Sequence, residues 1–143
     1  MRGFSLHIVR LFPGESRGVS LVEFALLAPL LMMILLGMLG YGQYFLIAHS
    51  AQQLANDAAR ATISGMSPAE RLSLANAAMA SELPNLPSIT ANNATLTVTE
   101  ALPSVTVHVR VDASAIGLFR VNLLPMPSST IDRSAVIQQG GVL

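Results

Sequence analysis

The sequence predicts an α+β protein, in which one long N-terminal transmembrane and amphipathic helix is followed by a short helix and a small antiparallel sheet of about three strands. Three patterns support this class: an uncharged apolar run from Phe24 to Ile47, a helical periodicity that continues to Ser64, and valines that alternate with polar residues after residue 94. A chain of 143 residues has room for one membrane span and one small domain.

The apolar run is long enough to cross a bilayer. Its roughly 24 residues form about 36 Å of α-helix, against a hydrocarbon core of about 30 Å. A core helix of a soluble protein would carry a polar stripe, but the first polar side chain after Glu23 that is not a tyrosine is Gln43. We therefore predict a transmembrane helix over residues 19–47, surrounded by membrane lipid, and an amphipathic continuation over residues 48–64.

The distribution of charge predicts the orientation of this helix. Arg2, Arg10 and Arg17 precede the apolar run, whereas Asp57 and Arg60 are the first charges after it. By the positive-inside rule the N-terminus is cytoplasmic and the rest of the chain lies outside. A cleaved secretory signal is the alternative, but the run is too long for its apolar region and the nearest Ala-x-Ala, residues 59–61, lies beyond it.

Three residues inside the apolar run are predicted to shape the packing of the helix. Pro29 removes one backbone hydrogen bond, which membrane helices tolerate when neighbours satisfy the freed carbonyl. Gly37 and Gly40 remove side chains, so that another helix can approach closely.

Glu23 is a lone carboxylate at the start of the apolar run. A charge in lipid costs a few kcal/mol, so a partner is expected. If the chain were cut after Gly18, the new amino group of Val19 would lie one helical turn from Glu23 and could neutralise it, within one chain or between neighbours. The alternative is an interfacial Glu23 whose carboxylate reaches water in the first turn of a helix.

The same region resembles a known family. The residues that carry the resemblance are Gly18-Val19-Ser20-Leu21-Val22-Glu23-Phe24-Ala25-Leu26-Leu27-Ala28-Pro29-Leu30-Leu31, then Gly42-Gln43-Tyr44, then Asn56-Asp57-Ala58-Ala59-Arg60-Ala61. Together they resemble the TadE-like family, pilin-like proteins of the tight adherence (Tad, or Flp) pilus systems. The resemblance implies a minor pilin or pseudopilin in the bacterial cytoplasmic membrane that works with other pilin-like subunits and the pilus assembly machinery.

The resemblance also implies a processing site. Prepilin peptidase would cut after Gly18, remove a cytoplasmic leader of residues 1–18, and leave Val19 as the first residue and Glu23 as the fifth. The protein would then be the substrate of an enzyme and not an enzyme itself.

Residues 65–143 are predicted to form a small extracytoplasmic α+β domain. Gly65 should end the long helix. The capping box from Ser67 to Glu70 should start a second helix at Pro68, and Pro84 should end it. Strands are expected around residues 95–99 and 105–111, joined as a hairpin through Pro103, with a third at about residues 129–137. The apolar stretch of residues 113–127 either closes over the sheet or forms a contact surface.

The composition argues against several functions. Eight basic residues balance eight acidic ones, which gives no reason to expect nucleic-acid binding, and the lack of cysteine removes disulfides and thiolate chemistry. His7, His49 and His108 are expected on different elements, and Asp112 and Asp132 are expected to be solvated turn formers. We therefore predict no enzyme activity, metal or cofactor.

Two alternatives stay open. An uncleaved single-span adaptor with an extracytoplasmic protein-binding domain would keep residues 1–18, and a secreted enzyme or inhibitor would begin near Ser50 or later.

Overall fold

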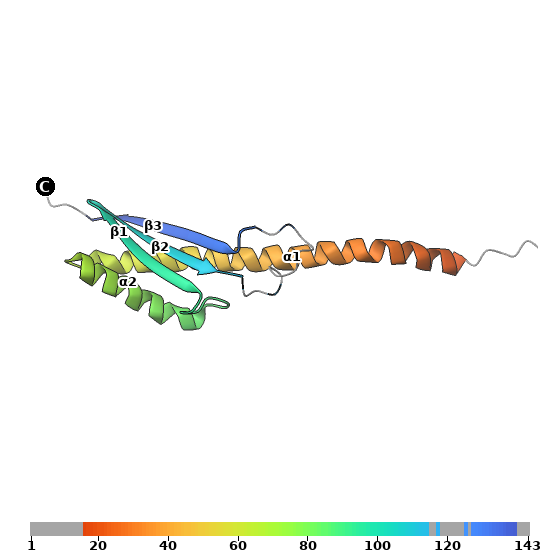
Figure 1. The fold of residues 1–143 in the computed structure, drawn as a ribbon, viewed down its shortest axis with the longest axis horizontal. Coiled ribbons are helices and arrows are strands. Elements are labelled where there is room, and N and C mark those ends of the chain that lie inside the picture. The colour runs from red at the N-terminus through yellow and green to blue at the C-terminus, as the bar shows by residue number, and fades with distance from the viewer. Residues whose placement is uncertain (1–15, 115–116, 118–124, 126, 140–143) are drawn as a thin grey trace, which may run out of the picture.

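The computed structural model describes residues 16–114, 117, 125 and 127–139 and confirms the predicted α+β class. A long helix is followed by a shorter helix and by three strands (Figure 1). The elements are α1 (Ser16–Ala61), α2 (Pro68–Glu82), β1 (Ala94–Ala101), β2 (Ser104–Asp112) and β3 (Thr130–Gln138), with short 3-10 turns at Thr62–Ser64 and Leu83–Asn85.

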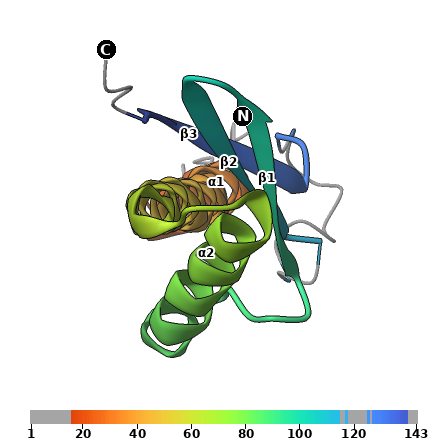
Figure 2. The same cartoon turned by 90° about the vertical axis from the view of Figure 1, so that its left-hand side faces the viewer.

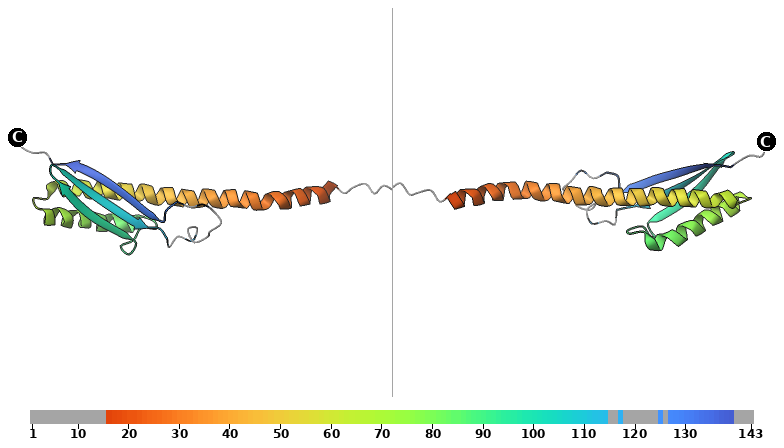
Figure 3. Two further views of the ribbon diagram at one scale, coloured as in Figure 1. Left: turned by 45° about the horizontal axis from the view of Figure 1, so that its top comes forward. Right: turned by 180° about the vertical axis from the view of Figure 1, so that it is seen from behind.

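The two halves of α1 have different surroundings. Its N-terminal half projects beyond the rest of the described chain, whereas its C-terminal half lies along the sheet (Figures 1 and 3). We call residues 19–39 the apolar arm. The first fully buried large side chain after it is Ile47, at 1% exposure, so the packed half begins there.

The sheet is antiparallel with strand order β1-β2-β3. Ala101 pairs with Ser104, which leaves Leu102 and Pro103 as a two-residue turn, as the hairpin prediction required. The side chains of β2 alternate between the two faces. Its inward valines are completely buried, and these are Val105, Val107, Val109 and Val111.

Both helices cover one face of the sheet, and the described residues leave the other face open (Figure 2). Small side chains on the packed half of α1 allow the close approach, since Ala51, Ala55 and Ala58 are fully buried. We call the opposite surface the outer face; it carries the polar side chains that alternate with the buried valines. The linking residues 115, 116, 118–124 and 126, which include Ile116, Leu118, Phe119, Val121, Leu123, Leu124 and Met126, lie outside the described residues, so the two interpretations of that stretch stay open.

The start of α2 follows the predicted capping box with one change. The Ser67 hydroxyl accepts a hydrogen bond from the Glu70 N–H at 3.2 Å, as expected. The Glu70 carboxylate accepts from the Met66 N–H at 2.9 Å, one residue before the N-cap. The box therefore spans one more residue than its standard form.

Gly65 ends the first helical unit, but for a different reason from the one expected. Its backbone is extended, with φ −79° and ψ 129°, so it does not use the left-handed conformation that favours glycine at helix ends. A Cβ at this position would lie 2.5 Å from Arg71 Cγ and 3.0 Å from the Arg71 backbone nitrogen. Close contact with α2 therefore favours glycine here.

Candidate functional site: the arm of the long helix

The apolar arm exposes large side chains along its whole length. Leu21 and Leu26 are 71% and 75% exposed, and the most apolar window of α1 has a mean hydropathy of 2.4 with no buried residue. A core helix of this chain would have its apolar side chains covered, so the arm needs cover from outside the described residues. By length and composition this one helix could span a membrane, as an N-terminal signal sequence could.

The predicted processing site lies in the first turn of α1. The helix begins at Ser16, three residues before the predicted start at Val19, so the bond between Gly18 and Val19 is inside the helix. A Cβ added to Gly18 would meet no atom within 4 Å among the described residues.

Glu23 lies one turn beyond Val19 on the same side of α1. The residue is exposed, and the side chains that the structure describes provide no ion-pair partner for it. Four residues separate the two positions, so the geometry permits a pair between Glu23 and a future Val19 amine.

The predicted packing residues lie along the same helix. α1 continues without a break through Pro29. Gly37 is partly buried and Gly40 is buried, and a spacing of three residues puts them on neighbouring positions of one face. Their proposed contact with another helix stays a prediction.

Aromatic side chains mark the junction between the arm and the domain. The Tyr41 hydroxyl donates a 2.6 Å hydrogen bond to the Pro125 carbonyl, 84 positions later in the chain. Tyr44 is half-buried against the core, and its ring packs edge-on to that of Phe45 at 5.7 Å. From the sequence, Tyr44 was quoted only for the family resemblance, and Tyr41 and Phe45 were given no role. Aromatic residues at the end of an apolar run are nevertheless the usual sign of a membrane interface.

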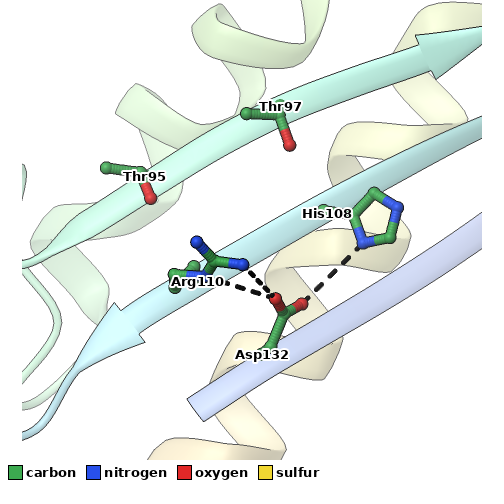
Figure 4. A pocket seen from close by; sticks show the side chains of 5 residues that line it. All are labelled: Thr95, Thr97, His108, Arg110 and Asp132. Atoms are coloured by element: carbon green, nitrogen blue, oxygen red, sulfur yellow. Dashed lines mark hydrogen bonds and ion pairs between the residues drawn. The ribbon is translucent and has the colours of Figure 1, made fainter. Parts of the chain in front are cut away.

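A polar cluster lies on the outer face, where Thr95, Thr97, His108, Arg110 and Asp132 surround a hollow of about 290 Å³ (Figure 4). Arg110 donates to one Asp132 oxygen from Nη2 at 3.0 Å and from Nε at 3.3 Å. His108 Nδ1 lies 3.8 Å from the other oxygen. These contacts follow from the register, which places Arg110 opposite Asp132.

Asp112 and Asp132, both predicted to be solvated turn formers, have different roles. Asp132 pairs with Arg110 inside the sheet, so its assignment as a turn former was wrong. Asp112 does shape a turn: it accepts the Ser114 N–H at 2.8 Å, and this hydrogen bond lowers the pKa of the Asp112 carboxyl.

The described histidines do not combine into a site. His49 is exposed on α1, which covers the inner face, and His108 belongs to the outer face. His7 lies outside the described residues. Within the described ranges, no group of three or more histidine or acidic side chains could hold a metal ion.

Comparison with known proteins agrees with this location of the candidate site. Residues 18–60 match the family model described as TadE-like protein, which confirms the resemblance and covers the arm together with most of the packed half of α1. No curated protein and no solved structure matches the chain. The match makes the N-terminal helix similar to that of proteins described as TadE-like and does not extend to the sheet.

Proposed function

Because residues 18–60 are TadE-like, we propose that this chain is a minor pilin or pseudopilin that takes part in assembly of a Tad (Flp) type IV pilus. One observation carries the proposal: the family match begins at Gly18, where an exposed apolar arm also begins. A helix of this kind can be held in a bilayer and later packed among the helices of other pilin-like subunits.

In this proposal prepilin peptidase cuts between Gly18 and Val19. The site lies in the first turn of α1 that the structure describes, and no described atom lies within 4 Å of a Cβ added at Gly18. The leader of residues 1–18 is removed, and the remaining helix stays anchored in the cytoplasmic membrane with its domain outside.

Cleavage changes the charge at the head of the arm. The new amino group of Val19 is positive and lies at the N-terminal end of a helix, where the helix dipole disfavours a cation. Glu23, one turn later, offsets that charge within the chain or on a neighbouring subunit. The pair would let the head of the arm enter an apolar environment at a lower cost than either charge alone.

The chain is, in this proposal, a substrate and structural subunit and not an enzyme. Its function would then reside in the anchor and in the subunit contacts. The partners would be prepilin peptidase, pilin-like subunits and membrane lipid, with no nucleic acid or cofactor.

An uncleaved single-span adaptor is the second candidate, and one observation favours it. The polar cluster on the outer face lines an open hollow of about 290 Å³, which gives the domain a surface on which another protein could bind. The domain would then bind another protein while the arm stays in the membrane.

Photo-crosslinking from the arm tests the assembly role. A photoreactive residue is placed at Leu26, which is 75% exposed, or at the control position Met66, which is 91% exposed beyond the far end of α1. In cells with the pilus machinery, we expect pilin-like subunits to be captured from position 26 and not from position 66. Capture of lipid alone from position 26 would contradict assembly and favour the adaptor.

A further inference from the structure

We infer that Tyr41 fixes the depth of this protein in the bilayer, so that the domain rests directly on the lipid headgroups with its membrane-side rim among them. The inference depends on the membrane anchoring of the proposed function, and not on processing or pilus assembly. It assigns a lipid-contact surface to two groups of residues: the aromatic belt Tyr41, Tyr44 and Phe45, and the proximal rim Asp112, Ser114, Ser129 and Thr130.

The length of the arm agrees with this depth. From Glu23 to Tyr41 the helix rises about 27 Å, close to the hydrocarbon thickness of about 30 Å. Glu23 would then lie at one hydrocarbon boundary and Tyr41 at the other, and Met32 would lie at the centre. A tyrosine is suited to that position, because its ring contacts acyl chains while its hydroxyl reaches polar groups.

The hydrogen bond from Tyr41 to Pro125 ties this boundary to the domain. A backbone carbonyl at the edge of the hydrocarbon region needs a donor, since water is scarce there. The Tyr41 hydroxyl supplies that donor at 2.6 Å. The same side chain thus contacts the arm, the domain and the proposed lipid surface.

A second contact shows which part of α1 lies beside the membrane-side end of the sheet. The Gln52 amide donates to the Ser134 carbonyl at 3.0 Å, which sets these two residues side by side. Thr130 precedes Ser134 by four residues, or about 13 Å of strand. That distance corresponds to about nine helical residues, which brings Thr130 level with Gln43, the first polar side chain after Glu23 that is not a tyrosine.

The direction of the strands agrees with this placement. β2 points toward the arm and ends at Asp112, which pairs with Thr130 at the start of β3 (Figure 1). Ile47 packs in the same cluster as Val111 and Ile131, whereas Ala58 packs with Val107 and Ile137 farther away. The sheet edge formed by Asp112 and Thr130 is therefore the membrane-side rim.

The chemistry of the rim suits headgroups. Asp112, Ser114, Ser129 and Thr130 help to line an open hollow of about 380 Å³. Their carboxylate and hydroxyl groups match the polar layer of about 5–7 Å that lies on each side of the hydrocarbon core. Phe45 and Leu46 follow Tyr41 by four and five residues, about 6–8 Å of helix, which places them level with the headgroups. They stay 64% and 49% exposed there.

The protein has no tryptophan, so single-tryptophan variants can report depth. The full-length chain is reconstituted in phosphatidylcholine vesicles as Met32→Trp, Tyr41→Trp or Thr130→Trp, with Ile63→Trp as the control beyond the membrane. Quenchers are lipids brominated near the chain ends, lipids brominated near the headgroup, lipids with a headgroup spin label, and iodide in solution.

We expect a different quencher to be strongest at each position. Met32→Trp should be quenched most by lipids brominated near the chain ends, and Tyr41→Trp by lipids brominated near the headgroup. Thr130→Trp should be quenched most by the headgroup spin label. Ile63→Trp should be quenched by iodide alone. If Tyr41→Trp matched either Met32→Trp or Ile63→Trp, the inferred depth would be wrong. If Thr130→Trp responded only to iodide, the domain would stand clear of the headgroups and the inference would fail.

A failure of the inferred depth can be told apart from a failure of membrane anchoring and from unfolding of the domain. If Met32→Trp also escaped every lipid quencher, the anchoring itself would be absent, and both the inference and the proposed function would fall. Hydrogen exchange of the β2 amides verifies that each variant keeps its domain folded. Phe45→Trp serves as a second position in the headgroup layer: it should repeat the result of Thr130→Trp, and a disagreement would overturn the inference.

Discussion

Arg71 and Glu100 form a two-bond ion pair that joins α2 to β1. Arg71 Nε lies 2.8 Å from Glu100 Oε1, and Nη2 lies 2.8 Å from Oε2. A third bond runs from Arg71 Nη1 to the Gly65 carbonyl at 2.9 Å. The Arg71 side chain is only 7% exposed and that of Glu100 19%, so this contact holds the turn before α2 and the edge of the sheet together away from water.

The ion pair predicts acid sensitivity of the domain. The hydrogen bond from Arg71 lowers the pKa of Glu100 below its ordinary value of 4.5, against the opposing effect of burial. A lowered carboxyl pKa stabilises the fold above the unfolded-state value, and this contribution is lost as the pH falls through the folded-state value. We expect the melting temperature to fall below about pH 4.5, and to fall less steeply in Glu100→Gln, as measured by circular dichroism.

The pH test has a matched control in Asp57→Asn, which removes a carboxylate on α1 that forms no ion pair with the described residues. This variant should keep the acid sensitivity of the unmodified chain. Equal pH profiles for Glu100→Gln and the unmodified chain would show that the pair contributes nothing measurable.

A methyl group at position 65 should destabilise the domain. The added Cβ of Gly65→Ala would come within 3.0 Å of the Arg71 backbone, and such overpacking typically costs about 1–3 kcal/mol. Gly42→Ala is the control, because its Cβ would meet no described atom within 4 Å and alanine favours helix by about 1 kcal/mol. Denaturant unfolding of the detergent-solubilised chain measures the free energy of unfolding. We expect this free energy to fall in Gly65→Ala and not in Gly42→Ala.

The two halves of α1 should respond differently to one substitution. Leu54 is 1% exposed, so Leu54→Ala removes core packing and should cost about 2–5 kcal/mol. Leu26 is 75% exposed in the arm, so Leu26→Ala should change domain stability by less than about 0.5 kcal/mol. Hydrogen exchange of the β2 amides measures both. Equal loss of protection would mean that the arm belongs to the domain core.

The sequence revealed most of the fold because its patterns are local. The apolar run and the periodicity beyond it define α1, the capping box starts α2, and the alternating valines define β2. The predicted division into leader, span, amphipathic continuation and domain stays a prediction.

The features that could not be predicted from the sequence all depend on contacts between residues far apart in the chain. Arg71 lies 29 positions from Glu100, and no local pattern announces that a charged residue of α2 will be buried. Asp132 meets Arg110 only through the register of β2 with β3, which are joined by residues 113–129. Tyr41 meets Pro125 across 84 positions. Spacing along a chain predicts elements well, but it does not fix how two elements align.

Removal of the carboxylate at the head of the arm should weaken subunit association. In Glu23→Ala the Val19 amine would lack its proposed partner, and loss of a charge-assisted bond of about 1.5–3 kcal/mol corresponds to a tenfold or larger drop in affinity. Co-isolation with pilin-like subunits from membranes measures this change. Glu82→Ala removes a carboxylate from α2 and should leave co-isolation intact. Unchanged association of Glu23→Ala would contradict the charge-pairing role.

The N-terminus of the mature chain tests the central claim most directly. The full-length protein is produced in cells with and without a working prepilin peptidase, extracted from membranes, and analysed by intact mass and N-terminal sequencing. We predict a chain that begins at Val19 when the peptidase is present and at Met1 when it is absent. A membrane-bound chain that begins at Met1 in both cells would contradict processing and support the uncleaved adaptor, and a membrane-free chain that begins near Ser50 would contradict the anchored helix altogether.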